Sequence, residues 1–242
     1  MMELEQILTY CDHTLLKPEA KASEVRKACD EAIRFNCASV CVPPCHVAGA
    51  RRYVQNRMRI CTVVGFPHGT ATTAVKVFET KDAIHNGADE IDMVVNLSMV
   101  KDGCWAEVAN DIRSVRNASE GAVLKVIIEC CKLTDEEKIR LCQIVADCGA
   151  DFIKTSTGFA EGGATPEDVV LMRANAPESL KIKAAGGISS VEDAAQFLTL
   201  GCSRLGTSRL VKLALEREQS PEAEENPENT PEHWGETLDF GK

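Results

Sequence analysis

The sequence lacks the features that place a protein in a membrane, outside the cell or on nucleic acid. None of its 242 residues lies in an uninterrupted apolar run long enough to match the about 18 residues of a membrane-spanning helix. Its start, Met-Met-Glu-Leu-Glu-Gln, has no basic flank followed by an apolar segment, so we expect no secretory signal. No stripe of Lys and Arg suggests a duplex-binding surface. We therefore expect a cytoplasmic protein that binds neither membrane nor nucleic acid.

Paired metal-ligand spacings are also missing. The five histidines form no H-x-H or H-E-x-x-H pattern, and Cys37, Cys41 and Cys45 followed by His46 make the one arrangement that suggests a metal. Structural zinc usually requires two close C-x2-C pairs, so we predict no metal site. The twelve cysteines are scattered through apparent strands and helices, which is typical of reduced thiols in the cytosol.

Charge is concentrated at the end of the chain. The formal net charge is −10, and the segment from Glu216 to Lys242 contains nine acidic and two basic side chains. Since the rest is nearly balanced, it can hold a local cationic pocket. Prolines among glutamates predict that 217–242 is a disordered acidic tail, in which Trp234, Leu238 and Phe240 are a possible docking motif. We expect one domain over residues 1–216.

Strand-like and helix-like runs alternate along that domain, which favours an α/β fold with a parallel sheet. Amphipathic helical patterns separate the runs and follow a short N-terminal helix; Ser23, Thr134 and Thr165 are the candidate helix caps. Eight strands suggest closure into a barrel. The predicted strands are 13–16, 38–43, 60–66, 90–96, 123–129, 151–155, 181–185 and 203–206, and the predicted helices are 22–36, 73–86, 105–115, 134–148, 165–175 and 191–200.

Two lysines each end an apolar run, Lys154 in Asp-Phe-Ile-Lys and Lys183 in Leu-Lys-Ile-Lys. If both runs are parallel strands, both amines lie at the carboxyl edge, where such sheets bind ligands. A free lysine is neutral in roughly one molecule in two thousand at pH 7. Burial and a neighbouring cation favour the neutral amine, which attacks carbonyls to form imines. The alternative for either lysine is a solvated residue or half of an ion pair.

A carboxylate and a further lysine belong to the same candidate site. The echo between Asn-Gly-Ala-Asp-Glu-Ile-Asp and Cys-Gly-Ala-Asp-Phe-Ile-Lys places Asp92 and Lys154 at equivalent positions of two strands. Strand alternation then puts Asp92, Lys154 and Lys183 in one layer inside the barrel. Lys125 is a second candidate, which points either inward or outward.

Glycine-rich turns follow the last two predicted strands. Their backbone N–H groups and the next helix N-terminus suit phosphate, although most such glycines are only turns. Gly158 is a candidate for a third side of this phosphate site. The candidate phosphate residues are Gly186 and Gly187 after the seventh strand, and Gly206, Thr207 and Ser208 after the eighth.

Five segments in this order resemble the deoxyribose-phosphate aldolase family. The resemblance spans residues 12 to about 212. It implies a (β/α)8 TIM barrel and a cofactor-free class I aldolase that cleaves 2-deoxy-D-ribose 5-phosphate to D-glyceraldehyde 3-phosphate and acetaldehyde in deoxynucleoside catabolism. The segments are Asp-His-Thr-Leu-Leu, Glu-Ile-Asp-Met-Val-Val-Asn, Lys-Val-Ile-Ile-Glu, Asp-Phe-Ile-Lys-Thr-Ser-Thr-Gly-Phe and Lys-Ala-Ala-Gly-Gly-Ile.

The resemblance also implies roles for individual residues. Lys154 forms the imine, Lys183 is the cation that favours its neutral amine, and Asp92 moves protons with Lys183 and a water. Polar contacts to substrate are implied for Asp12, Thr14 and Thr157. Cys41 either lies near the site, as a strand-2 cysteine does in some members, or is a small buried apolar residue.

Two positions depart from the family pattern. Arg209 stands where a small residue is more common, and it either grips phosphate or faces solvent. The chain does not end on a tyrosine, since its two tyrosines are Tyr10 and Tyr53.

Two other functions stay open: a different phosphate-binding barrel, such as an isomerase or an aldolase of a longer ketose phosphate, and an inactive barrel whose tail recruits a partner. By analogy, we expect a possible homodimer.

Overall fold

Eight parallel strands form a closed barrel in the computed structural model, which describes residues 2–219. Each strand pairs with its neighbours in sequence, and β1 also pairs with β8, so the sheet has no edge. The strands are β1 (Cys11–Thr14), β2 (Ser39–Cys41), β3 (Ile60–Val64), β4 (Glu90–Val94), β5 (Val123–Ile127), β6 (Phe152–Lys154), β7 (Lys181–Ala185) and β8 (Cys202–Thr207).

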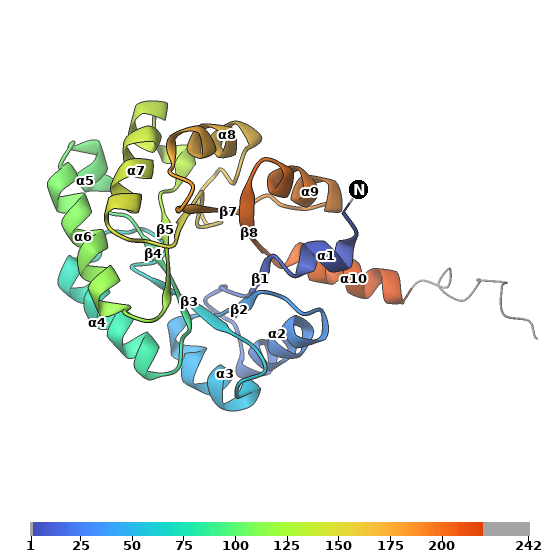
Figure 1. Cartoon of the computed structure of the whole chain (residues 1–242). Helices are drawn as coiled ribbons and strands as arrows, with labels where there is room; N and C mark the ends of the chain where they lie inside the picture. The colour runs from blue at the N-terminus through green and yellow to red at the C-terminus, as the bar shows by residue number, and fades with distance from the viewer. Residues whose placement is uncertain (1, 220–242) are drawn as a thin grey trace, which may run out of the picture.

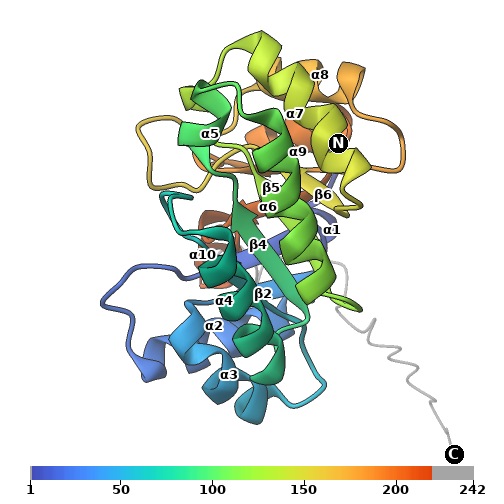
Figure 2. The same ribbon diagram turned by 90° about the vertical axis from the view of Figure 1, so that its left-hand side faces the viewer.

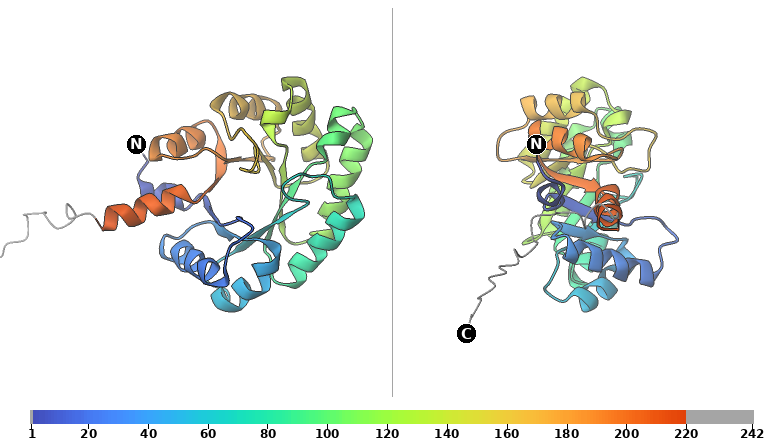
Figure 3. Two further views of the ribbon diagram at one scale, coloured as in Figure 1. Left: turned by 180° about the vertical axis from the view of Figure 1, so that it is seen from behind. Right: turned by 90° about the vertical axis from the view of Figure 1, so that its right-hand side faces the viewer.

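Helices surround the barrel as an outer ring (Figure 1), and the view from behind shows the same ring (Figure 3). Helix α1 lies beside α9 and α10 at the closure. The helices are α1 (Leu4–Leu8), α2 (Ala22–Arg34), α3 (Val47–Val54), α4 (Thr73–His85), α5 (Leu97–Lys101), α6 (Trp105–Ala118), α7 (Asp135–Asp147), α8 (Pro166–Asn175), α9 (Val191–Thr199) and α10 (Arg209–Glu218), with 3-10 turns at Pro44–His46 and Cys130–Lys132.

The fold is the predicted (β/α)8 TIM barrel, and its apolar core lies between strands and helices. On β4, Ile91 and Met93 are fully buried in that core, whereas Glu90 and Asp92, on the other face, are fully buried inside the barrel. Alternation along a strand separates the two sets. On this strand, the barrel interior therefore holds charged side chains, whereas the layer between strands and helices holds apolar ones. Within residues 2–219, no helix is long and apolar enough to cross a membrane.

Helix starts follow the predicted capping chemistry at two positions and depart from it at one. Thr134 accepts a hydrogen bond from the N–H of Glu137 at 3.3 Å, and Thr165 accepts one from Asp168 at 3.1 Å. The prediction for Ser23 is wrong. The N-cap of α2 is Lys21, two residues before Ser23, because the N–H of Lys21 donates to the Glu24 carboxylate at 2.8 Å and fixes the first turn there.

Several other elements also differ from the predictions. Helices α3 and α5 were not predicted, since each is short and α3 contains Gly49. Strand β1 begins at Cys11 rather than at residue 13, because the structure pairs Cys11 with Leu205 and Asp12 with Ser39. The predicted tail boundary at 216 falls inside α10, whose Glu218 forms an ion pair with Arg34 at 2.6 Å. Residues 220–242, which include the possible docking motif, lie outside the described residues.

One buried ion pair ties two outer helices to the barrel. Lys76 of α4 donates to Asp111 of α6 at 2.6 Å and to the carbonyl oxygen of Val94, at the end of β4, at 2.9 Å. Both charged side chains are almost fully buried. Thr73 donates to the second Asp111 oxygen at 2.8 Å. The pair holds α4 and α6 together on one side of the barrel, which faces the viewer in Figure 2.

The Asp111→Ala substitution is expected to lower the free energy of unfolding by about 3–5 kcal/mol, because it leaves the Lys76 ammonium buried without a partner. Urea denaturation measures this loss. The double substitution Lys76→Met with Asp111→Leu is the matched control, and it should recover most of the loss because neither charge remains buried. A double variant no more stable than the single one would contradict this reading.

Candidate active site

A pocket of about 430 Å³ opens at the carboxyl ends of the strands. Its wall combines one lysine with glycine-rich turns and a few apolar side chains. Its lining residues are Thr14, Leu16, Lys154, Thr157, Gly158, Phe159, Ala185, Gly186, Gly187, Ile188, Ser189, Gly206, Thr207, Ser208 and Arg209. This is the edge at which barrels of this kind carry their active sites.

Asp92 is the centre of a buried ion cluster behind that wall. Its Oδ2 atom accepts hydrogen bonds from Lys154 at 2.8 Å and from Lys183 at 2.7 Å. Its Oδ1 atom accepts one from Lys125 at 2.8 Å and one from the Cys61 thiol at 3.2 Å. The predicted meeting of Asp92, Lys154 and Lys183 is therefore confirmed. The two amines share one oxygen, so they lie no farther apart than the sum of the two distances.

Asp12 and Glu90 complete the acidic side of the cluster. Asp12 accepts hydrogen bonds from Lys183, from Ser39 at 2.7 Å and from Arg204 at 2.5 Å. Glu90 contacts Lys125 at 2.6 Å and Arg204 at 2.9 Å. The Asp12, Glu90 and Asp92 side chains are all fully buried. These contacts link β1, β4, β5, β7 and β8 across the barrel interior.

The mutual attraction in this cluster keeps its members charged. Burial opposes ionisation of Asp92, but attraction to Lys125, Lys154 and Lys183 outweighs it and holds the pKa of Asp92 well below its ordinary value. Burial likewise opposes protonation of Lys183, yet Asp12 and Asp92 raise its pKa above the ordinary value. The pKa of Lys125 is raised in the same way, by Asp12 and Asp92. Lys125 and Lys183 are therefore fixed cations.

Lys154 differs from the other two lysines of the cluster in its contacts and in its position. It has one carboxylate partner, Asp92, whereas Lys183 has two and Lys125 has three within 4 Å. Lys154 is also the one that lines the pocket. Lys125, Lys154, Lys183 and Arg204 make four cations against three carboxylates. Lys154 is therefore the lysine of the cluster that has the fewest carboxylate partners and that can meet a ligand.

Positive backbone angles shape the glycine-rich side of the pocket. Gly186 and Gly187 have φ of +80° and +78°, which side-chain-bearing residues rarely adopt. At Gly206, an added Cβ would lie 2.9 Å from the Cβ of Ala185 and would fill the turn. The Thr207 hydroxyl donates to the carbonyl oxygen of Ile188 at 3.1 Å and so joins the two turns. Together they form a concave backbone surface suited to an anion.

Most of the predicted substrate contacts lie on the pocket wall, but three lie deeper. Asp12, Cys41 and Lys125 are buried inside the barrel and do not line the pocket. Lys125 points inward, which settles its orientation, and both Asp12 oxygens are already engaged. The residues on the wall are Thr14, Thr157, Gly158, Gly186, Gly187, Gly206, Thr207 and Ser208, and Arg209 lies beside them, 3.7 Å from Glu216.

Several residues of the site were not predicted. Glu90 precedes Asp92 by two residues, and Arg204 precedes Gly206 by two residues, so strand alternation was a usable signal for both. Glu129 has a left-handed backbone with φ of +54°. Its buried carboxylate accepts hydrogen bonds from the N–H of Thr157 at 3.1 Å and from the Thr157 hydroxyl. Glu129 thereby positions the turn that follows Lys154.

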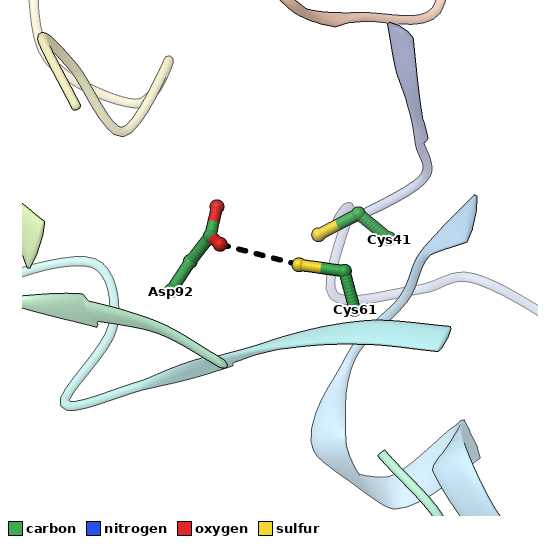
Figure 4. Close-up of side chains that lie close together, drawn as sticks. All are labelled: Cys41, Cys61 and Asp92. Atoms are coloured by element: carbon green, nitrogen blue, oxygen red, sulfur yellow. Dashed lines mark hydrogen bonds between the residues drawn. The ribbon is translucent and has the colours of Figure 1, made fainter. Parts of the chain in front are cut away.

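Two thiols lie next to Asp92 on neighbouring strands (Figure 4). Cys41 of β2 and Cys61 of β3 are register partners, and both are almost fully buried. A hydrogen bond between the two thiols lowers the pKa of Cys41, whereas burial raises the pKa of Cys61 well above its ordinary value. Lys125 also contacts the Cys61 sulfur at 3.3 Å. In the sequence, the arrangement that suggested a metal grouped Cys41 with Cys37 and Cys45, not with Cys61.

The fold and the site define a barrel enzyme with a buried lysine cluster at its ligand-binding edge. The family model for DeoC/LacD family aldolases matches residues 6–205. The chain belongs to this family, and it is therefore an aldolase, a carbon–carbon lyase.

Proteins of known sequence and structure agree with this assignment. A Streptococcus agalactiae deoxyribose-phosphate aldolase is 54% identical over 88% of this chain and 95% of its own length. One from Streptococcus pyogenes is 51% identical over 92% of this chain and all of its own length. The crystal structure of a putative deoxyribose-phosphate aldolase from Coccidioides immitis is 39% identical, has a TM-score of 0.86, and aligns over 90% of this chain and 87% of its own.

The substitution Asp12→Asn is expected to make stability less sensitive to acid. Burial opposes ionisation of Asp12, but Lys125, Lys183 and Arg204 hold its pKa below the ordinary 3.8. The folded carboxylate thus stays ionised where the unfolded one takes up a proton. Its stabilising effect is complete above about pH 5 and falls as the pH drops further.

Unfolding free energies measured between pH 5 and pH 3 test this expectation. The slope against pH should be shallower in Asp12→Asn by up to about one proton per chain. Asp102→Asn, at an exposed carboxylate after α5, is the control and should keep the wild-type slope. Equal slopes in wild type and Asp12→Asn would show that Asp12 is not held ionised by its partners.

Proposed function

We propose that the protein reversibly cleaves 2-deoxy-D-ribose 5-phosphate to D-glyceraldehyde 3-phosphate and acetaldehyde through an imine on Lys154. One observation carries the proposal: Lys154 is the buried lysine that both reaches the pocket and has the fewest carboxylate partners. The names of the 51–54% identical relatives support the choice of substrate. The proposal places the reaction in deoxyribonucleotide catabolism.

The chemistry needs the neutral form of an amine that meets the substrate, and Lys154 is the amine of the cluster that lines the pocket. The Lys154 amine attacks C1 of the open-chain sugar, and loss of water gives a protonated imine. The C3 hydroxyl then loses its proton, and the C2–C3 bond breaks. Its electron pair moves into the imine and leaves an enamine on Lys154. Glyceraldehyde 3-phosphate departs, the enamine takes up a proton at its terminal carbon, and water releases acetaldehyde.

Lys183 and Asp92 have complementary roles in this scheme. Lys183 stays protonated because Asp12 and Asp92 hold it so, and its positive charge disfavours a second one on Lys154. Asp92 contacts both amines through a single oxygen, so it can pass protons between them and a water in the pocket. No step of this scheme requires a metal or an organic cofactor.

The phosphate is expected at the other end of the pocket. The turns that contain Gly186, Gly187 and Gly206 face the same cavity as Lys154. Their backbone N–H groups and the start of α10 favour an anion. The Arg209 guanidinium is about half exposed at this end and adds positive charge. This arrangement orients the sugar with C1 toward Lys154 and its phosphate toward β7 and β8.

Assembly and domain limits extend the proposal. The chain is expected to act as a single barrel domain that includes all of α10, which ends at Glu218, followed by the acidic C-terminal segment. A solved deoxyribose phosphate aldolase from Aeropyrum pernix, 30% identical with a TM-score of 0.83, is described as a tetramer. A homodimer remains our prediction for this chain.

Product analysis after incubation with 2-deoxy-D-ribose 5-phosphate tests the function. We expect equal amounts of acetaldehyde and glyceraldehyde 3-phosphate, and no turnover in Lys154→Ala, because that variant has no amine to form the imine. Lys181→Ala removes an exposed lysine at the opposite end of β7 and should retain activity. Cleavage only of a longer ketose phosphate would favour another aldolase. No turnover of either substrate would favour an inactive barrel.

The Lys183→Leu substitution is expected to depress kcat by several powers of ten and to move the rate–pH profile to higher pH. Without the neighbouring cation, more of Lys154 stays protonated at neutral pH. Steady-state rates across the pH range measure both effects, with Lys181→Leu as the matched control on the same strand. A slow variant with the wild-type pH profile would mean that Lys183 does not act through its charge.

A further inference from the structure

The cluster of Cys41, Cys61 and Asp92 is a second candidate site inside the barrel, and the aldolase reaction uses neither of its thiols. The three side chains project from β2, β3 and β4 toward one point (Figure 4). Two sulfurs and one carboxylate oxygen all lie within 4.8 Å of one another, and all three residues are buried. Thiolates with a carboxylate are a ligand set for thiophilic divalent cations.

The spacing of the three atoms fits a metal ion with little movement. Tetrahedral zinc has Zn–S distances of about 2.3 Å and Zn–O distances of about 2.1 Å, which place its ligand atoms about 3.6–3.8 Å apart. The Cys61 sulfur is already 3.2 Å from Oδ1 of Asp92. Cys41 and Cys61 are direct neighbours across two strands, so the backbone holds their sulfurs together.

The charges around the cluster do not oppose such an ion. Two thiols that bind a divalent cation release two protons, so the metal–dithiolate unit is neutral. Together with the Asp92 carboxylate it carries one negative charge. Lys125 lies 3.3 Å from the Cys61 sulfur and 2.8 Å from Oδ1 of Asp92, where it can donate to the same ligands. Lysine ammoniums that would repel a bare cation therefore stabilise the assembled complex.

The cluster lies next to the pocket. Leu16 and Phe66 are partly buried and pack against Cys41, Cys61 and Val63. Leu16 also lines the pocket. The pocket is therefore the side from which a small ion would approach the cluster.

We propose that Cys41, Cys61 and Asp92 bind one thiophilic divalent cation of the zinc or cadmium type, and that the bound ion inhibits the enzyme. Inhibition rests on the proposed function, because it acts through Asp92. A bound ion engages the Asp92 carboxylate, which is the shared hydrogen-bond acceptor of Lys154 and Lys183, so Asp92 can no longer pass protons between them. Metal thus acts as an inhibitor here and is not a requirement for turnover.

Cadmium titration of the full-length, reduced and chelator-treated protein tests the site. The readouts are the ultraviolet band of cadmium–thiolate bonds and the protons released in weak buffer, neither of which depends on turnover. We expect one tight ion and about two protons per chain. Cys41→Ser and Cys61→Ser should each weaken binding at least a hundredfold. The double variant Cys45→Ser with Cys131→Ser, at two exposed cysteines, is the matched control and should bind as wild type.

Equal affinity in wild type, Cys41→Ser and Cys61→Ser would overturn the site, as would loss of the ion in the control alone. Circular dichroism shows whether the two serine variants fold. If they do not, the ¹¹³Cd NMR shift of the control variant decides: a value for two sulfur ligands supports the site, and one for oxygen and nitrogen alone refutes it.

Turnover is a separate readout of the same titration. Saturating cadmium should lower the rate of 2-deoxy-D-ribose 5-phosphate cleavage more than tenfold, and EDTA should restore it. A metal-loaded protein with an unchanged rate would refute inhibition while the site stands. If the metal-free protein has no aldolase activity, the proposed function fails, and the absorbance and proton readouts still decide whether the site exists.

Discussion

The Asp92 carboxylate organises the interior of this barrel. One side chain accepts hydrogen bonds from Lys125, Lys154, Lys183 and Cys61, and it reaches β3, β5, β6 and β7 from β4. An unpaired carboxylate in this environment would be very costly. The three ammonium groups around Asp92 hold its pKa well below the ordinary value. The positions of the lysines, and the excess of one positive charge among them, follow from this arrangement.

The same arrangement separates structural charge from reactive charge. Lys125 contacts Asp12, Glu90 and Asp92, so three carboxylates stabilise its protonated form inside the barrel, away from the pocket. Lys154 lies nearer the pocket and shares a single oxygen with Lys183. Stability therefore depends on the deep pairs, whereas reactivity belongs to the amine that lines the pocket and has one carboxylate partner. Apolar packing between strands and helices carries the remaining stability of the fold.

Much of this arrangement could be predicted from local patterns, and the rest depends on contacts between distant strands. Alternation along β4, β6 and β7 was enough to bring Asp92, Lys154 and Lys183 together, and the predicted glycine turns line the same pocket as Lys154. Arg204, Glu90 and Cys61 were missed because their roles arise from partners up to 192 residues away in the chain. Asp12 was predicted to contact the substrate, but its carboxylate accepts hydrogen bonds from Lys183 and Arg204. These contacts exist only because the barrel closes.

Mass mapping after borohydride reduction tests the central claim most directly. Acetaldehyde is added to the protein, the imine is reduced, and digestion locates the added two-carbon group. The charge balance predicts that this group appears on Lys154, once per chain, well before any exposed lysine reacts. Modification of Lys183 or Lys125 instead, or of no buried lysine, would contradict the account.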